Sequence, residues 1–214
     1  VSIYGRYNCS QKLKQQIAWK DSDKQMIWTS IVFQKIKMQA ENLSYFNLSQ
    51  SSLLNKYLTE IEFNDETNRE GHAAKVYFNA MFGNEFSRSD DNPINAMLNY
   101  GYSILLSDFN REIVSSGYST MLGLFHDNVH NSFNLSCDLM EPFRPIVDRY
   151  VRSNIPEKFE TEEKHSILSI LNKEYVIDSC KQTLSNAIKI YTHSVFDAIE
   201  NNDLSLIKYY SYEL

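Results

Sequence analysis

Glycine and proline are scarce in this sequence, which has six Gly and four Pro among its 214 residues. β-Sandwiches and β-barrels need a turn roughly every 8 to 12 residues, and these two residue types supply many of those turns. The shortage argues against both folds and favours helices.

Cysteine is also scarce, and long apolar runs are missing. Cys9, Cys137 and Cys180 form an odd, widely spaced set without a Cys-x-x-Cys pair, which predicts reduced thiols and a cytoplasmic protein. No apolar run approaches the roughly 18 residues of a membrane span, and the first ten residues lack the features of a signal peptide. We therefore expect no membrane partner.

The sequence does contain enough apolar side chains to form a core, and its charged residues are unevenly distributed along the chain. With 43% hydrophobic and 13% aromatic residues the chain can close a core, whereas its net charge of −6 argues against a non-specific nucleic-acid coat. All four positive charges within residues 111–152 are nevertheless arginines, whose planar guanidinium pairs well with phosphate. The alternative is pairing inside the chain with acids such as Glu112 and Asp148.

Apolar spacing and capping residues predict an all-α fold. The expected helices lie within 17–36 and within 41–67, where a loop follows the helix, then from Asn68 to Gly83 and from Asn92 and Pro93 to Gly117. Further helices are expected over 132–151, with a kink at Pro142 and Pro145, and at 164–173 and 180–200. Residues 118–131 and 153–163 are predicted to connect them.

Two groups of polar residues could carry chemistry. Asp138 and Glu141 share a helix face and could bind Mg²⁺ or Mn²⁺, or lie in solvent with Glu141 paired to Arg144. His126 and His130 have the spacing of a helical zinc pair, although Asp127 stands where a metalloprotease has Glu. No P-loop, GxGxxG turn or GxSxG elbow is present, which disfavours nucleotide-cofactor and nucleophile chemistry.

Four motifs spread over residues 68–148 resemble one known family. They are Asn68-Arg69-Glu70-Gly71-His72-Ala73-Ala74 with Tyr77, then Asn95-x-x-Leu98-x-Tyr100-x-Tyr102, then Gly117 to Gly123 with His126, and finally Asp138-Leu139-Met140-Glu141-Pro142-Phe143-Arg144-Pro145-x-x-Asp148. In order and spacing they resemble the CRISPR adaptation integrases, the Cas1 family, and most closely its type II-A branch. Gly117-Tyr118-Ser119-Thr120 departs from the Gly-Leu-x-Pro segment common in that family.

The resemblance implies a metal-dependent DNA endonuclease and integrase that inserts foreign DNA into a CRISPR array by attack of a 3′-hydroxyl on a phosphodiester. It implies that Glu70, His126 and Glu141 bind Mg²⁺ or Mn²⁺ and that Asp138 supports the site. Candidates for holding DNA phosphates are Arg69, Lys75, Arg111, Arg144 and Arg149. His130 lies outside the motif.

Several partners follow from the same resemblance: spacer-precursor DNA and the CRISPR repeat, a Cas2 dimer, and a second copy of the full-length chain. For a type II-A system they also include an RNA-guided effector nuclease and an accessory protein that binds DNA ends. Members of the family carry an N-terminal β domain before the helical one. Accordingly, residues 1–11 are expected to be a linker or remnant of that domain, 12–152 the helical catalytic core, and 153–214 its C-terminal helical extension.

Two other functions stay open at this point. The helical domain could serve mainly as a scaffold for assembly with Cas2, without catalysis. An unrelated helical protein that binds zinc through His126 and His130 is the other alternative.

Overall fold

The protein is mostly helical in the part of the chain, residues 9–212, that the computed structural model describes. Its elements are, in order, α1 (Cys9–Ile17), α2 (Asp21–Tyr45), α3 (Ser51–Leu58), η2 (Phe63–Asp65), α4 (Arg69–Phe82), α5 (Pro93–Ser115), α6 (Asn134–Met140), η3 (Glu141–Phe143), α7 (Arg144–Ser153), α8 (Thr161–Leu168), η4 (Ser169–Asn172), β1 (Glu174–Ile177), β2 (Cys180–Thr183), α9 (Leu184–Asn201) and η5 (Leu204–Leu206). The predicted all-α class is confirmed, with one small hairpin added. Within these residues no helix has the length and apolar character needed to cross a membrane.

The elements group into two compact units. The described part of unit 1 comprises residues 9–30, 106–140 and 171–212, and unit 2 comprises residues 31–105 and 141–170. Both α2 and α5 contribute residues to each unit. The predicted linker 1–11 lies outside the described residues except for its last three positions, which begin α1.

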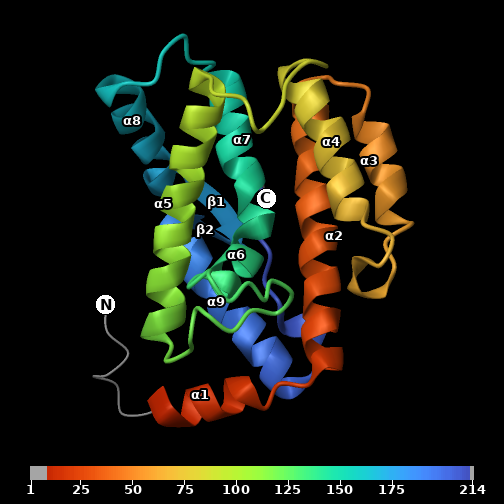
Figure 1. Cartoon of the computed structure of the whole chain (residues 1–214), viewed down its shortest axis with the longest axis vertical. Helices are drawn as coiled ribbons and strands as arrows, with labels where there is room; N and C mark the ends of the chain where they lie inside the picture. The colour runs from red at the N-terminus through yellow and green to blue at the C-terminus, as the bar shows by residue number, and fades with distance from the viewer. Residues whose placement is uncertain (1–8, 213–214) are drawn as a thin grey trace. The chain divides into compact units, whose positions relative to one another are not determined.

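Unit 2 is built around the buried faces of α2, α4 and α7, with α3 beside α4 (Figure 1). Asn42 of α2 is fully buried and connects the three helices. Its amide nitrogen donates to Tyr77 Oη at 2.8 Å and to the carbonyl oxygen of Pro145 at 2.7 Å, while its oxygen accepts from Arg149 Nε at 2.8 Å. A buried amide satisfied on both sides fixes the relative register of these helices.

The ends of α4 and α5 follow the predicted capping signals. Asn68 adopts left-handed backbone angles before α4, and its side chain accepts from the backbone N–H of Gly71. Gly83 ends α4 with φ of 105°. Asn92 Oδ1 accepts from the backbone N–H of Asn95 at 2.8 Å at the start of α5, so both predicted starts are confirmed.

The first long helix differs from its prediction. It runs over Asp21–Tyr45 instead of 17–36, and a separate helix, α1, ends at Ile17. The turn at residues 18–20 separates them. The apolar spacing predicted the buried stripe correctly. The first turn of α2 is polar and the helix past Ile36 has a weaker apolar pattern, so the spacing did not predict where the helix begins and ends.

The predicted kink at the two prolines is confirmed as a change of helix type. α6 ends at Met140, a 3-10 turn follows over Glu141–Phe143, and α7 begins at Arg144. Proline lacks the N–H that continues an α-helix, so Pro142 interrupts the ladder of hydrogen bonds. The interruption begins at Glu141, one of the predicted site residues.

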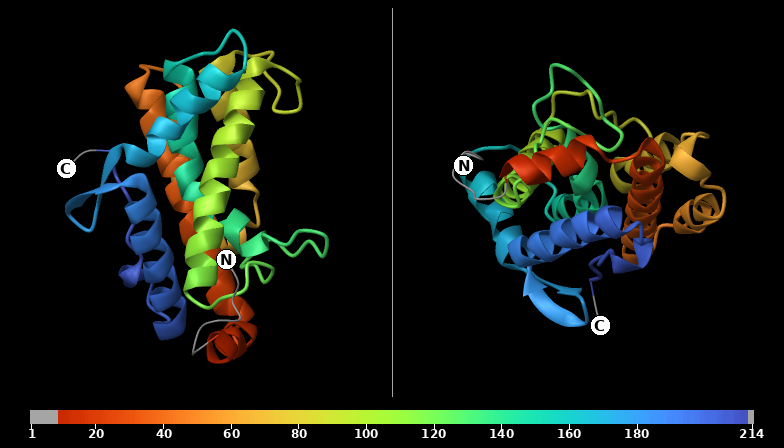
Figure 2. Two further views of the ribbon diagram at one scale, coloured as in Figure 1. Left: turned by 90° about the vertical axis from the view of Figure 1, so that its left-hand side faces the viewer. Right: turned by 90° about the horizontal axis from the view of Figure 1, so that it is seen from below.

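In unit 1 a hairpin replaces the start of the helix expected at 180–200. β1 and β2 pair antiparallel with Ile177 opposite Cys180, and both intervening residues, Asp178 and Ser179, have positive φ. These angles form a tight two-residue turn. The hairpin packs against α9, which begins at residue 184 (Figure 2).

The helix prediction at 180–200 is therefore wrong for residues 180–183, which form β2, and the strand at 174–177 was not predicted. Tyr175, Val176 and Ile177 are aromatic or β-branched, and all three are buried in β1. Such residues favour a pleated strand when a turn-forming pair follows them. A four-residue strand is too short for its period to be distinguished from a helical one in the sequence.

Candidate functional site

Two of the predicted metal ligands, Glu70 and Glu141, converge within unit 2. Glu70 lies in the first turn of α4, whose start is held by Asp65: its carboxylate accepts from the backbone N–H of Arg69 at 2.8 Å and from that of Glu70 at 3.0 Å. Glu141 is the first residue of η3 and is only 6% exposed. The element ends thus bring two carboxylates to one place.

A lysine ammonium lies between these carboxylates. Lys35, on the buried face of α2 and 7% exposed, donates through Nζ to Glu141 Oε2 at 2.5 Å and also to Glu70 Oε1. Burial alone lowers the pKa of Lys35, but the charges of Glu141 and Glu70 outweigh it and raise that pKa. The side chain is therefore a cation held by two anions.

Arg144 contacts the other oxygen of Glu141. Its Nε donates to Glu141 Oε1 at 2.8 Å, and its guanidinium lies 4.7 Å from the ring centroid of Tyr102. Burial raises the pKa of Glu141, but Arg144 and Lys35 more than offset that effect and lower it to about 2. Glu141 is ionised at neutral pH and can act as an oxygen ligand.

These side chains line a cavity of about 220 Å³ within unit 2. Besides Lys35, Glu70, Glu141 and Arg144, its walls include Gln39, Ala74, Phe78, Arg88, Tyr102 and Asp148. Two carboxylates that already surround one cation form a donor set of the kind that hard divalent cations prefer. The residues present fit Mg²⁺ or Mn²⁺.

Asp148 forms a second buried acidic group in the same cavity. It is 1% exposed and accepts a hydrogen bond from Tyr102 Oη. Burial raises the pKa of Asp148 from 3.8 to about 6, against the opposing effects of hydrogen bonds from Tyr102 and Tyr77 and the charge of Arg88. Ionising this carboxyl therefore costs folding free energy.

We expect Asp148→Asn to change how stability depends on pH. The folded protein holds the Asp148 proton more tightly than the unfolded chain, so its free energy of unfolding falls as pH rises from about 4 to about 6. The two pKa units involved correspond to about 3 kcal/mol. Urea unfolding at pH 4, 5, 6 and 7 should give curves of stability against pH that diverge between wild type and variant, and parallel curves would contradict the prediction.

The other two predicted site residues, His126 and Asp138, pair within unit 1. Asp138 on α6 is fully buried, and its carboxylate accepts from the backbone N–H groups of Leu124, Phe125 and His126 at 2.6, 3.0 and 3.2 Å. His126 Nδ1 lies 2.5 Å from Asp138 Oδ1. An ionised carboxylate only accepts, so Nδ1 carries the proton and a neutral ring has its lone pair on Nε2, the form in which imidazole binds metals.

Gly123 gives this loop its shape. A Cβ atom there would lie 2.2 Å from the carbonyl oxygen of His126 and 2.8 Å from Asp138 Oδ2. The contact with His126 cannot be relieved without movement of the backbone, and the contact with Asp138 would displace its carboxylate. The ring of Phe125 stacks on Trp28 with 4.4 Å between centroids, which further fixes the segment that carries His126.

The structure thus gives two pairs, Glu70 with Glu141 in unit 2 and His126 with Asp138 in unit 1. Among residues 9–212 no group of three or more His, Cys, Asp or Glu side chains is arranged to hold a metal ion. The three-ligand set of Glu70, His126 and Glu141 stays a prediction. His130 is exposed in a non-helical segment, so it lacks the helical geometry that the zinc alternative requires.

Three of the five candidate phosphate-binding residues make ion pairs with acids, and the pair of Arg144 with Glu141 is described above. Arg69 lies 3.2 Å from Glu60, and Arg111 lies 3.0 Å from Asp108 and 3.2 Å from Glu112. The contact of Arg111 with Glu112 corresponds to the alternative that the charge pattern left open. The Arg69–Glu60 pair is partly exposed, and pairs of that kind contribute little stability, whereas Asp108 and Glu112 are buried.

The other candidates have different surroundings. Lys75 is exposed on α4 and makes no ion pair within residues 9–212. Arg149 donates to Asn42, and its guanidinium lies 4.3 Å from the ring centroid of Tyr45. Arg144 belongs to the cavity through Glu141. Their contact with DNA remains a proposal.

Lys35 was not predicted as part of the site, and neither were Tyr102 and Asp148, although Tyr102 and Asp148 lie in the matched motifs. Lys35 had one available signal: it follows the apolar stripe of α2 directly before Ile36, at a position where a lysine is buried only if it is paired. Its partners are 35 and 106 residues away in sequence, so no local pattern could identify them.

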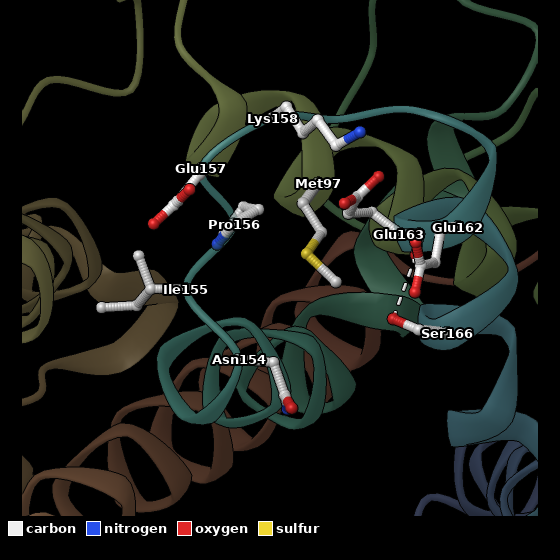
Figure 3. A pocket seen from close by; sticks show the side chains of 9 residues that line it. All are labelled: Met97, Asn154, Ile155, Pro156, Glu157, Lys158, Glu162, Glu163 and Ser166. Carbon is white, nitrogen blue, oxygen red and sulfur yellow. Dashed lines mark hydrogen bonds between the residues drawn. The ribbon is translucent and has the colours of Figure 1, made fainter.

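Unit 2 contains a further cavity, of about 370 Å³, between α5, the segment after α7, and α8 (Figure 3). Met97 projects into it, and Glu157, Glu162 and Glu163 stand around it, with Ser166 Oγ donating to the carbonyl oxygen of Glu163. It shares no lining residue with the cavity of Glu70 and Glu141. None of the predicted site residues lies there.

Two solved structures share the helical fold of this chain. A casposase bound to integration product has a TM-score of 0.77 and 21% sequence identity, covering 93% of this chain and 71% of that one. A chain of a Cas6-RT-Cas1--Cas2 complex has a TM-score of 0.78 and 21% identity, covering 98% of this chain and 27% of its own. Identities this low show a shared fold alone.

The family follows from the sequence comparison. The model for CRISPR associated protein Cas1 matches residues 2–182, so the chain belongs to the Cas1 family. It is 39% identical over 147 residues to CRISPR-associated endonuclease Cas1 of Neisseria meningitidis serogroup C, covering 68% of this chain and 48% of that protein. It is 28% identical over 190 residues to a Cas1 endonuclease of Francisella tularensis subsp. novicida, with 74% and 60% covered. The chain therefore spans about half the length of these curated relatives.

Proposed function

We propose that this chain is the catalytic helical part of a metal-dependent DNA endonuclease and integrase that inserts spacers into a CRISPR array. The observation that carries the proposal is the convergence of Glu70 and Glu141 on one buried cation position. The names of the relatives, CRISPR-associated endonuclease Cas1, and the casposase bound to integration product support the same chemistry.

Glu70, His126 and Glu141 are proposed to hold Mg²⁺ or Mn²⁺, with Asp138 orienting His126. The ion would supply Lewis acidity that activates a DNA 3′-hydroxyl and screens charge on the attacked phosphodiester. No covalent enzyme intermediate is needed, which agrees with the lack of a nucleophile motif.

The chain's own side chains position the reactants. Arg144 holds Glu141 in one orientation and adds positive charge beside the cavity, where Arg88 stands as well. Such fixed cations stabilise the negative charge that develops on a phosphate during transfer. Further phosphate contacts are proposed for Arg69, Lys75, Arg111 and Arg149.

The proposed partners are spacer-precursor DNA, the CRISPR repeat, a Cas2 dimer and a second copy of the full-length chain. A structural relative that includes Cas2 supports this proposal. An effector nuclease and a DNA-end-binding protein would join them if the system is type II-A. A cytoplasmic location belongs to the same proposal and is supported by the free thiols of Cys137 and Cys180.

The direct test is strand integration by the full-length protein with Cas2, using a short DNA duplex with free 3′-hydroxyls and a plasmid carrying a CRISPR repeat. We expect joined products with Mg²⁺ or Mn²⁺ and none in EDTA. Assembly with Cas2 and DNA that yields no joined product with any divalent cation would instead assign the chain a scaffolding role.

A further inference from the structure

The cavity lined by Glu70 and Glu141 is balanced in charge without a metal, since its three carboxyl groups, with Asp148 as the third, share it with Lys35, Arg88 and Arg144. Glu70 and Glu141 pair directly with two of these cations, Lys35 and Arg144. Lys35 contacts Glu70 Oε1 and Glu141 Oε2, and Arg144 contacts Glu141 Oε1. Each oxygen of Glu141 therefore already has a cationic donor.

A divalent ion that binds these carboxylates must compete with the Lys35 ammonium. Carboxylate oxygens bind Mg²⁺ at about 2.0–2.1 Å, and an ammonium at hydrogen-bond distance from Glu70 Oε1 and Glu141 Oε2 occupies the space between them that the ion needs. Two cations at one buried point also repel strongly in a low-dielectric setting. The ammonium and the ion exclude each other.

A second acceptor for a displaced ammonium lies one helical turn further along α2. Gln39 lines the same cavity and is 1% exposed. Within the described part of the chain its buried Oε1 has no hydrogen-bond partner. Side chains four residues apart on a helix lie on one face, so Lys35 can reach it by a change of rotamer.

We propose that Lys35 is an internal placeholder cation: it holds Glu70 and Glu141 together in the metal-free protein and must leave them before a divalent ion binds. The inference rests on the proposed function, since it takes these two residues as metal ligands. It makes Lys35 a positioning residue whose charge keeps metal affinity low until the ammonium is displaced.

The test is a titration of the protein with Mn²⁺ in the absence of DNA. The electron paramagnetic resonance signal of free Mn²⁺ measures how much of the ion stays unbound. Lys35→Met keeps a side chain of similar length but removes the charge, and we expect at least about tenfold tighter binding than wild type. Lys37→Met is the matched control, because Lys37 is exposed on the same helix, and it should bind as wild type does. Equal or weaker binding by Lys35→Met would overturn the proposal.

A measurement on the wild-type protein covers the case in which Lys35→Met does not fold. Crystal structures with and without Mn²⁺ should show Nζ leaving both carboxylates when the ion is present, and Nζ still bound to both beside the ion would overturn the proposal. Adding Glu141→Gln separates the two claims. If wild type and Lys35→Met bind Mn²⁺ equally, and both lose Mn²⁺ binding when Glu141→Gln is added, the metal site stands and the placeholder role fails. If adding Glu141→Gln changes Mn²⁺ binding in neither protein, the proposed metal site fails together with the placeholder role.

Discussion

Glu141→Gln is expected to lower the rate of strand integration at least about 100-fold while the chain stays folded, in line with losses seen when one stabilising group is removed from a site of charge development. The amide has nearly the same size as the carboxylate and can still accept from Arg144 or Lys35. It lacks the negative charge that a divalent ion requires of its ligand. The loss should therefore appear in chemistry and in metal binding more than in DNA binding.

Three measurements on the same preparation separate these effects. Strand integration gives the rate, Mn²⁺ titration gives metal affinity, and a DNA mobility shift in EDTA gives affinity without metal. Circular dichroism checks that the helices remain. A rate within about threefold of wild type would show that Glu141 is not a ligand the reaction needs.

Glu200→Gln is a suitable control for this prediction. Glu200 also accepts from a lysine, Lys12 at 2.7 Å, and from Tyr118 Oη, but it lies on α9 in unit 1 and has no part in the proposed site. Loss of its charge should leave the integration rate unchanged. A general sensitivity to removing a paired carboxylate would lower both rates.

Local signals in the sequence predicted those parts of the fold that depend on neighbouring residues. Asn68 and Asn92 cap helices, Gly83 ends one, and Pro142 interrupts another, because each acts on backbone groups within four residues. The hairpin at 174–183 escaped prediction because its strands are short and gain their stability from packing against α9 and from the bridge between Val176 and Ser211.

The candidate site likewise has residues that the sequence could predict and one whose role it could not. Glu70, Glu141, His126 and Asp138 could be chosen because their motifs resemble a known family, and the structure pairs them two by two. The role of Lys35 could not be predicted, because it depends on which distant carboxylates face α2. Whether a lysine side chain is buried and which carboxylate it pairs with depend on the tertiary structure, and the local sequence around the lysine specifies neither.

Asp138 carries the other large expected effect, through the loop before α6. Its fully buried carboxylate is the acceptor for three consecutive backbone N–H groups, of residues 124–126, and for the ring of His126. Hydrogen bonds to a charged acceptor contribute about 1.5–3 kcal/mol each, and a buried group left unpaired costs more than the bond it lost. One carboxylate thus organises the segment that presents His126.

We expect Asp138→Asn to cost about 3 kcal/mol of unfolding free energy, at the lower end of what breaking a buried charged network costs. The amide keeps one oxygen, but its NH₂ group turns donors toward backbone N–H groups that need acceptors. His126 also loses the partner that fixes its tautomer. Partners of metal-binding histidines typically affect metal affinity or activity by about 10- to 100-fold, and we expect integration to fall by that amount.

Hydrogen exchange locates the effect of Asp138→Asn. The amides of Leu124, Phe125 and His126 should lose protection, while the amides of α9 should exchange as in the wild type under native conditions. Asp127→Asn is the matched control, since Asp127 is exposed next to His126 and should change neither stability nor protection. Retained protection and wild-type stability in Asp138→Asn would mean that the loop holds its shape without the charge. A loss of stability with an unchanged integration rate would instead remove His126 from the proposed ligand set. If His126 were a ligand, a misoriented imidazole ring would lower the integration rate.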